Sequence, residues 1–337
     1  MDDSEYGKRD KRGDWKPFKR IAYPPVVVWP AQPVGFVKWL FGYPGHILPW
    51  NFLYASLAII VWMYLTPPLD TMQTLAPGWI GFVLARNAAL TVLLVGFFHW
   101  RLYVRKAQGK LFKYNAKWLD TDNPVFLFRN QTVDNIIWTF ASGVPIWTAY
   151  EVLTLWAFAN GYIFLVSWET HPVYCVALLV LIPLIREVHF YLVHRLIHWP
   201  ALYRTVHNLH HNNVNPGPWS GLAMHPGEHL LYFSGVLVHW ILPSHPIHAL
   251  FHLLHAGLSP AQGHTGFEKV VVGKDRSFDT ECYAHYLHHK YFECNYADGA
   301  IPLDRWFGTF HDGSEEAHEA MNKRFLSRHA HRQPQTT

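Results

Sequence analysis

Residues 194–211 read HRLIHWPALYRTVHNLHH, and residues 285–289 read HYLHH. Together they contain three histidine clusters: His194-x-x-x-His198, His207-x-x-His210-His211 and His285-x-x-His288-His289. Positions three and four residues apart share one face of a helix, so each cluster directs two or three imidazoles the same way. Eight neutral imidazoles aimed at one place exceed what a hydrogen-bond network needs, and imidazole binds iron, zinc, copper and nickel. These clusters predict a helical site for two transition-metal ions.

The composition favours a membrane protein. Only 15% of the 337 residues are charged, whereas about 25% is usual in globular proteins. The 16 Trp, 17 Tyr and 22 Phe residues are typical of chains with aromatic belts at the membrane interfaces. Three scattered cysteines without a C-x-x-C motif predict no disulfide framework.

Five apolar regions are expected to enter the membrane. Four can cross a hydrocarbon core of about 30 Å at about 1.5 Å per residue. They are residues 47–66, 78–100, 136–158 and 172–193. The second contains Arg86, which must face a partner or extend to the interface. The fifth, 230–258, is interrupted by Pro243 and Pro246, and is expected to be a hairpin of two short helices or a re-entrant segment.

The expected fold is therefore all-α: a polytopic membrane helix bundle with a cytosolic helical cap that carries the histidine-rich di-metal site. The N-terminal tail and the linker 101–117 are basic, whereas the loop 159–171 has no Lys or Arg. The positive-inside rule places the two basic segments, and with them the three clusters, on the cytosolic face of a multi-pass protein.

Four divisions of the chain are expected. Residues 1–46 form a cytosolic or interfacial extension, of which the first 20 are expected to be flexible. A transmembrane hairpin with a basic linker follows (47–135), then the catalytic domain (136–312) and a flexible C-terminal tail (313–337). No signal peptide is expected, because no apolar run closely follows the first charges.

Further histidines need separate consideration. His264 follows the hairpin and lies between glycines, so it is either a ninth metal ligand, which we prefer, or a hydrogen-bonding residue of its loop. His225 and His229 are candidates for metal ligands, for donors that support a ligand, or for pocket residues. His189 lies off the face of His194 and is expected to support ligands. A structural or interfacial role is expected for His239, His245, His248, His252 and His255.

Three carboxylates are candidates to support the metal ligands. Metal-bound histidines usually donate their second N–H to a carboxylate or carbonyl. Glu187 lies seven residues before His194, Glu281 lies four before His285, and Glu228 follows the second cluster. The alternative for each is an interfacial charge paired with a nearby arginine such as Arg186.

Imidazole ligands alone do not select the metal. The H-E-x-x-H signature of zinc proteases is absent. Many histidines with open coordination positions beside a membrane fit dioxygen activation by a pair of irons, which would carry the cleavage of an unactivated C–H bond.

The clusters and their flanking residues resemble the fatty acid hydroxylase / sterol desaturase superfamily. The resemblance runs from about residue 180 to 312 and includes Tyr191-Leu-Val-His194, His225-Pro226-x-Glu228, His289-x-Tyr291-Phe292-x-Cys294-Asn295-Tyr296 and Asp304-Arg305-x-Phe307-Gly308-Thr309. It implies a non-haem di-iron, O2-dependent membrane hydroxylase or desaturase. The eight cluster histidines would then be metal ligands, and His264 would be the ninth.

The partners follow from this resemblance. The chain has neither the His-Pro-Gly-Gly of a fused cytochrome b5 domain nor a GxGxxG fingerprint. Electrons are therefore expected from a separate donor, which is cytochrome b5-, ferredoxin- or reductase-like and docks at the basic cytosolic face. The other expected partners are the lipid bilayer and a lipid substrate, with no nucleic acid.

Two other classes of function stay open. A membrane metal transporter or metal-binding protein would place its ligands near the middle of the bilayer, and a bis-His haem electron carrier would place histidines on facing spans. Within the leading hypothesis the substrate is a sterol, a fatty acyl or sphingoid chain, or a carotenoid-like lipid. Hydroxylation and desaturation are both possible, because each begins with hydrogen abstraction.

Overall fold

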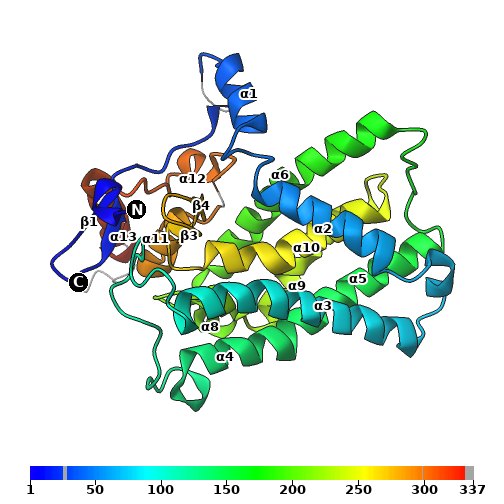
Figure 1. The fold of residues 1–337 in the computed structure, drawn as a ribbon, viewed down its shortest axis with the longest axis horizontal. Helices are drawn as coiled ribbons and strands as arrows, with labels where there is room; N and C mark the ends of the chain where they lie inside the picture. Colours follow the sequence, from blue (N-terminus) through cyan, green and yellow to red (C-terminus); the bar gives the residue numbers. More distant parts are fainter. Residues whose placement is uncertain (26–28, 298, 331–337) are drawn as a thin grey trace, which may run out of the picture.

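The computed structural model describes residues 1–25, 29–297 and 299–330. Its elements are almost all helical, as the sequence predicts, and only two short two-stranded sheets accompany them. Long helices lie side by side along one direction, and shorter elements gather at one end of them (Figure 1). We call these shorter elements the end lobe; its segments are residues 1–25, 105–130, 200–222 and 264–330.

The long helices coincide with the expected apolar runs. They are α2 (Trp50–Tyr64), α3 (Pro77–His99), α5 (Val144–Ala159), α6 (Pro172–Ile197) and α10 (Pro246–Gly263). A π-helical turn extends α3 to Val104, and α4 (Gln131–Trp138) leads through another π-helical turn into α5. By length and composition, Pro77–Val104 and Pro172–Ile197 are long and apolar enough to cross a membrane, whereas α2 has 15 residues.

Helix α10 is the centre of the bundle. It contacts α2, α3, α5 and α6, and 14 of its 18 residues are buried, so its polar side chains must find partners inside the protein. Close packing requires a glycine here, since a Cβ on Gly257 would lie 2.6 Å from the ring of Trp147. Within the same interior, His252 Nδ1 lies 3.3 Å from His239 Nε2, and His255 bonds to Asn51 at 2.9 Å.

The region 230–258 is a pair of helical segments rather than one span, as both the hairpin and the re-entrant alternative require. Its first arm is α9 (Pro226–Phe233), continued by a 3-10 helix to Trp240, and its second arm is α10.

Arg86 of α3 has a carboxylate partner inside the bundle. Its guanidinium bonds to the Glu151 carboxylate of α5 and donates to the Leu65 carbonyl at 3.0 Å. Asn87 donates to the second Glu151 oxygen at 2.9 Å.

The end lobe is built from short elements. Its strands are β1 (Gly7–Arg9), β2 (Trp15–Pro17), β3 (Lys269–Val271) and β4 (Ser277–Asp279), paired antiparallel as β1–β2 and β3–β4. Its helices are α7 (Pro200–Leu202), α8 (Asn208–His211), α11 (Tyr283–Tyr291), α12 (Leu303–Trp306) and α13 (Glu315–Ala330). One helix, α1 (Pro33–Phe41), stands apart from both the lobe and the bundle (Figure 1).

Both ends of the chain differ from the expected flexible tails. Trp15 is buried against Phe112 and Tyr114, and this contact fixes the N-terminal hairpin onto the lobe. Helix α13 buries Met321 in the same cluster. The expectation was wrong because the charged composition of both segments conceals single apolar anchors. Residues 331–337 of the expected C-terminal tail lie outside the described residues.

Candidate metal centre

Histidines from four segments meet where the bundle joins the end lobe. The end of α6 supplies His194 and His198, the turn into α8 supplies His207, His210 and His211, the C-cap of α10 is His264, and α11 supplies His285, His288 and His289. Except for His198 and His285, which are partly buried, these side chains are buried. The structure thus brings together all nine histidines that the sequence analysis favoured as ligands.

The nine side chains form two groups, and within each group the ligand atoms lie within 4.8 Å of one another. The first group is His194, His198, His207, His211 and His288, and the second is His210, His264, His285 and His289. Each H-x-x-H-H cluster contributes to both groups. Its outer pair, four residues apart, faces one group, and the histidine between them faces the other.

The second group converges on a point. The Nε2 atoms of His264, His285 and His289 form a triangle with sides of 3.0, 3.1 and 3.1 Å. Each Nε2 has one hydrogen or one lone pair in its ring plane, so N–H···N bonds cannot satisfy all three sides at once. Ligands bound to one ion at about 2.0–2.1 Å lie at about this separation from their neighbours. The triangle therefore has the dimensions of a coordination site.

The first group has the same character. His211 Nε2 lies 3.2 Å from His198 Nε2 and 3.1 Å from His288 Nε2. His207 Nε2 is buried and has no hydrogen-bond partner among the described residues. A buried lone pair without a donor is costly in a folded protein, and a metal ion in this group would satisfy it.

Hydrogen bonds at the opposite ring nitrogen set the tautomer of several ligands. Four Nδ1 atoms lie near backbone carbonyl oxygens: His194 near Tyr296 (2.8 Å), His288 near Cys294 (2.7 Å), His264 near Pro260 (2.7 Å) and His210 near Ala223 (3.3 Å). His207 Nδ1 lies 2.8 Å from a carboxylate oxygen of Glu228. Carbonyl and carboxylate oxygens only accept, so each Nδ1 donates and each Nε2 offers its lone pair to the site.

Burial keeps these imidazoles neutral. It lowers the pKa of His210 to about 4 and that of His264 to about 3, and it holds the pKa values of His211 and His288 well below the usual range. Neutral imidazole is the form that binds a metal. The donor set, its tautomers and its spacing therefore fit two transition-metal ions.

The three candidate carboxylates have different roles. Glu228 bonds to His207, as a supporting carboxylate should. Glu187 instead accepts the backbone N–H groups of Gly299 and Ile301 at 2.8 and 3.0 Å. Glu281 has an exposed side chain in the wall of a cavity, and among the described residues no hydrogen bond joins it to a cluster histidine.

The three remaining candidates from the sequence, His189, His225 and His229, lie outside both groups. His229 Nδ1 is 2.7 Å from the Ser142 hydroxyl and its Nε2 is 3.2 Å from the Leu222 carbonyl, so both ring nitrogens have protein partners. His225 caps α9 by accepting from the N–H of Gly227. His189 bonds to the Ser234 hydroxyl at 3.0 Å.

Asp304 organises the loop behind the first group, a role that its sequence spacing does not predict. Its buried carboxylate accepts from the N–H groups of Tyr296 and Ala297 at 2.9 and 2.8 Å and from the Thr309 hydroxyl at 2.5 Å. These bonds hold the Tyr296 carbonyl that accepts from His194. The only signal in the sequence was the position of Asp304 in a motif shared with the resembled family.

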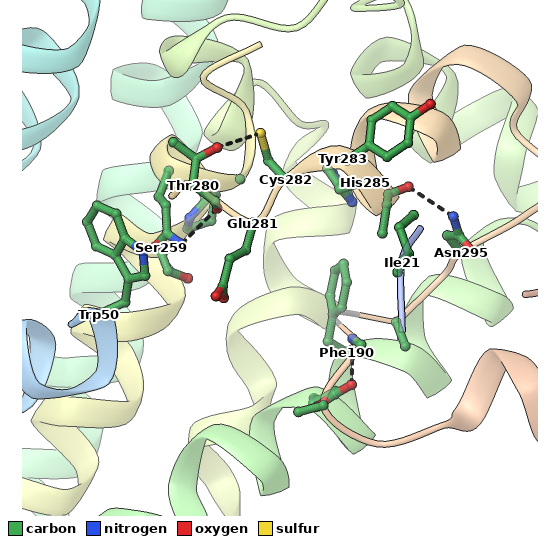
Figure 2. Close-up of a pocket in the computed structure, with 18 of the residues that line it drawn as sticks. Ile21, Trp50, Phe190, Ser259, Thr280, Glu281, Cys282, Tyr283, His285 and Asn295 are labelled. Atoms are coloured by element: carbon green, nitrogen blue, oxygen red, sulfur yellow. Dashed lines mark hydrogen bonds between the residues drawn. The ribbon is translucent and has the colours of Figure 1, made fainter. Parts of the chain in front are cut away.

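A cavity of about 550 Å³ reaches both groups. Its inner end is lined by His194 and His207 of the first group and by His210, His264 and His285 of the second. Ile21, Trp50, Phe190 and Glu281 surround the same space (Figure 2). Its size lies within the range of about 300–1,000 Å³ usual for small-molecule sites.

Comparison with known proteins identifies the domain that carries this centre. Residues 179–309 match the family described as fatty acid hydroxylase. This segment is thus similar to the fatty acid hydroxylase / sterol desaturase superfamily. The matched segment contains all nine clustered histidines, Glu228 and Asp304, whereas α1 and the N-terminal hairpin lie outside it.

Several proteins to which this chain is similar are sterol desaturases. The Delta(7)-sterol 5(6)-desaturase ERG3B of Gibberella zeae is 29% identical over 129 residues, which cover 37% of this chain and 38% of the relative. The Delta(7)-sterol 5(6)-desaturase of Candida glabrata is 28% identical over 203 residues, 56% of this chain and 53% of the relative. That of Aspergillus fumigatus, erg3A, is 28% identical over 200 residues, 58% and 54% of the two chains.

The chain thus spans about half the length of these relatives or less. No solved structure matches it.

Proposed function

We propose that this protein is an O2-dependent membrane di-iron oxygenase that hydroxylates or desaturates an unactivated C–H bond of a lipid. The observation that carries the proposal is the pair of histidine groups, which present converging neutral imidazoles at the end of a cavity of about 550 Å³. The fatty acid hydroxylase domain supports this chemistry. Among sterol, fatty acyl, sphingoid and carotenoid-like lipids, the sterol desaturases among the relatives favour a sterol.

Each part of the centre has a defined task in this proposal. Bound iron would supply the activation of dioxygen. The first group would hold one ion and the second group would hold the other. Glu228 and the carbonyls of Tyr296, Cys294 and Pro260 fix the ligand rings, which limits reorganisation when charge changes at the site. The cavity would hold the lipid against both groups.

The membrane arrangement is part of the proposal. We place the long helices across the bilayer in a polytopic bundle and the end lobe in the cytosol. Two helices of sufficient length and the basic linker 101–117 next to the lobe support this placement. The extension (1–46), the transmembrane hairpin with its linker (47–135) and the catalytic domain (136–312) then keep the divisions expected from the sequence. Electrons would come from a separate cytochrome b5-, ferredoxin- or reductase-like donor at the basic face.

Lipid analysis of a deletion strain against its parent tests the proposed reaction. The deletion strain is expected to accumulate a lipid that lacks one hydroxyl group or one double bond, and the intact gene should restore the product. A gene carrying His288→Ala is the matched control and should not restore it, because His288 belongs to the first histidine group. Identical lipid profiles with and without the gene, or restoration by the His288→Ala variant, would refute the proposal.

A further inference from the structure

Helix α1 is an apolar helix without a buried side chain. Its Val34, Val37 and Phe41 side chains are 68%, 53% and 63% exposed, and their spacing places them on one face. Trp29, before the helix, is 90% exposed, and Tyr43, after it, is 59% exposed. Soluble monomers rarely leave such a continuous apolar patch in water, so this surface requires an occupant.

The position of α1 indicates what covers its apolar surface. In Figure 1 the helix projects sideways next to the junction between the long helices and the end lobe, and its axis runs across the direction of α2 and α10. If the long helices cross the membrane, as proposed above, this junction lies at the level of the lipid headgroups. A short apolar helix with flanking aromatic residues and a lysine at that level can lie in the plane of the interface with its apolar side chains among the acyl chains.

The charge of the surrounding segment fits the same occupant. Residues 15–69 contain no Asp or Glu. Of their four cationic residues, Lys16 and Arg20 pair with carboxylates of the end lobe, whereas Lys19 and Lys38 form no ion pair among the described residues. Lys38 lies on α1 itself and is exposed. Cationic side chains beside exposed Trp and Tyr residues are typical of surfaces that contact anionic headgroups.

A short connection fixes α1 to the wall of the cavity. The ring of Trp39 packs on His46 at 4.7 Å, and His46 Nε2 bonds to the Val180 carbonyl of α6 at 2.9 Å. Asn51 at the start of α2 donates to the His46 carbonyl at 2.7 Å. Trp39 and His46 also line the cavity that reaches the histidine groups, together with Tyr23 of the N-terminal segment.

We propose that α1 is an in-plane membrane helix whose apolar face inserts among acyl chains, and that it forms the bilayer side of the entrance to the cavity. The inference rests on the membrane placement in the proposed function and adds the route of the substrate. A lipid would then move from the bilayer past Trp39 to the metal centre without crossing water. The segment responsible lies outside the matched domain, so it is a feature of this chain's own extension.

Site-specific fluorescence of the full-length protein tests the insertion. Val37→Cys would be labelled with an environment-sensitive dye in vesicles of phosphatidylcholine and phosphatidylserine that contain a nitroxide-labelled acyl chain. The three native cysteines are buried, and the exposed Val37 tolerates the exchange. The matched control is Asn322→Cys, an exposed position on α13 of the end lobe.

Blue-shifted emission and quenching at Val37→Cys, without quenching at Asn322→Cys, is the expected result. Water-like emission without quenching at Val37→Cys would overturn the proposal. Blue-shifted emission without quenching would also overturn it and would indicate a protein partner or a second copy as the occupant. Equal quenching at both positions would also overturn it. The measurement needs neither metal nor turnover, so its failure is distinguishable from failure of the proposed reaction.

A second variant tests the entrance. Val37→Asp introduces a charge on the inserted face, far from any histidine of the two groups in sequence and outside the matched domain. In the deletion strain it is expected to lower the lipid product several-fold with an unchanged metal content. An unchanged amount of product would refute the role of α1 at the entrance.

Discussion

Replacing Glu228 with Gln tests how far the hydrogen bonds behind the ligands tune the metal centre. The Glu228 carboxylate is buried, and one oxygen lies 2.8 Å from His207 Nδ1. Its other oxygen has no partner among the described residues, and burial raises the pKa of this carboxyl. Glutamine preserves the volume and an acceptor oxygen, so the exchange removes the ionisable group and puts an amide NH2 in place of the oxygen that has no partner.

The structure predicts opposite effects on metal binding and on stability. Loss of such a partner typically lowers metal affinity about 10- to 100-fold, or about 1.4–2.8 kcal/mol. Without metal, a buried carboxylate bonded to a neutral imidazole has a desolvation cost that glutamine avoids. The metal-free variant should therefore be as stable as the parent protein or more stable.

Chelator competition and thermal unfolding measure the two quantities on purified protein. Glu169→Gln is the matched control, because Glu169 is exposed in the loop between α5 and α6 and should change neither quantity. Unchanged metal affinity in the Glu228→Gln protein would refute the supporting role. A loss of metal-free stability in parallel with a loss of affinity would indicate that Glu228 acts only in folding.

Three further predictions concern stability. Burial lowers the pKa of His210 to about 4 and that of His264 to about 3, whereas both are about 6.5 in the unfolded chain. The unfolded state therefore binds more protons as the pH falls, and the metal-free protein should lose stability from about pH 6.5 downward. A stability that does not change with pH in this range would contradict the prediction. Glu151→Ala leaves Arg86 buried without its carboxylate and should lower the free energy of unfolding in detergent by about 3–5 kcal/mol. Adding Arg86→Met to this variant should restore part of the loss. An unchanged stability of the Glu151→Ala protein would exclude a role for the pair. Trp15→Ala removes the N-terminal anchor and should lower the free energy of unfolding by about 3–5 kcal/mol. Residues 1–25 should then become sensitive to limited proteolysis. A cleavage pattern like that of the parent protein would count against the packed hairpin.

Eight of the nine favoured ligands could be found from the sequence because their spacing is local, whereas His264 stands alone in its loop. Residues three and four apart share a helix face whatever the rest of the fold, so the three clusters were visible before any tertiary structure. The division of each H-x-x-H-H between two groups was not visible. It depends on how α6, α8 and α11 meet, which no local spacing encodes.

Other outcomes depended on contacts distant in the chain. His229 and His264 look similar in the sequence, but His229 meets Ser142, whereas His264 faces His285 and His289. Hydropathy located α10 but could not show that its surroundings are other helices rather than lipid. Trp15 shows the opposite case, because one buried ring orders a segment whose charge favours disorder.

The metal content of the purified protein tests the central claim most directly. The two histidine groups predict about two irons per chain and no haem absorbance. His210→Ala and His288→Ala remove one ligand from the second and the first group respectively, so each variant should lose metal and turnover. About one zinc with no redox activity, or full metal content and turnover in either variant, would contradict the di-iron assignment.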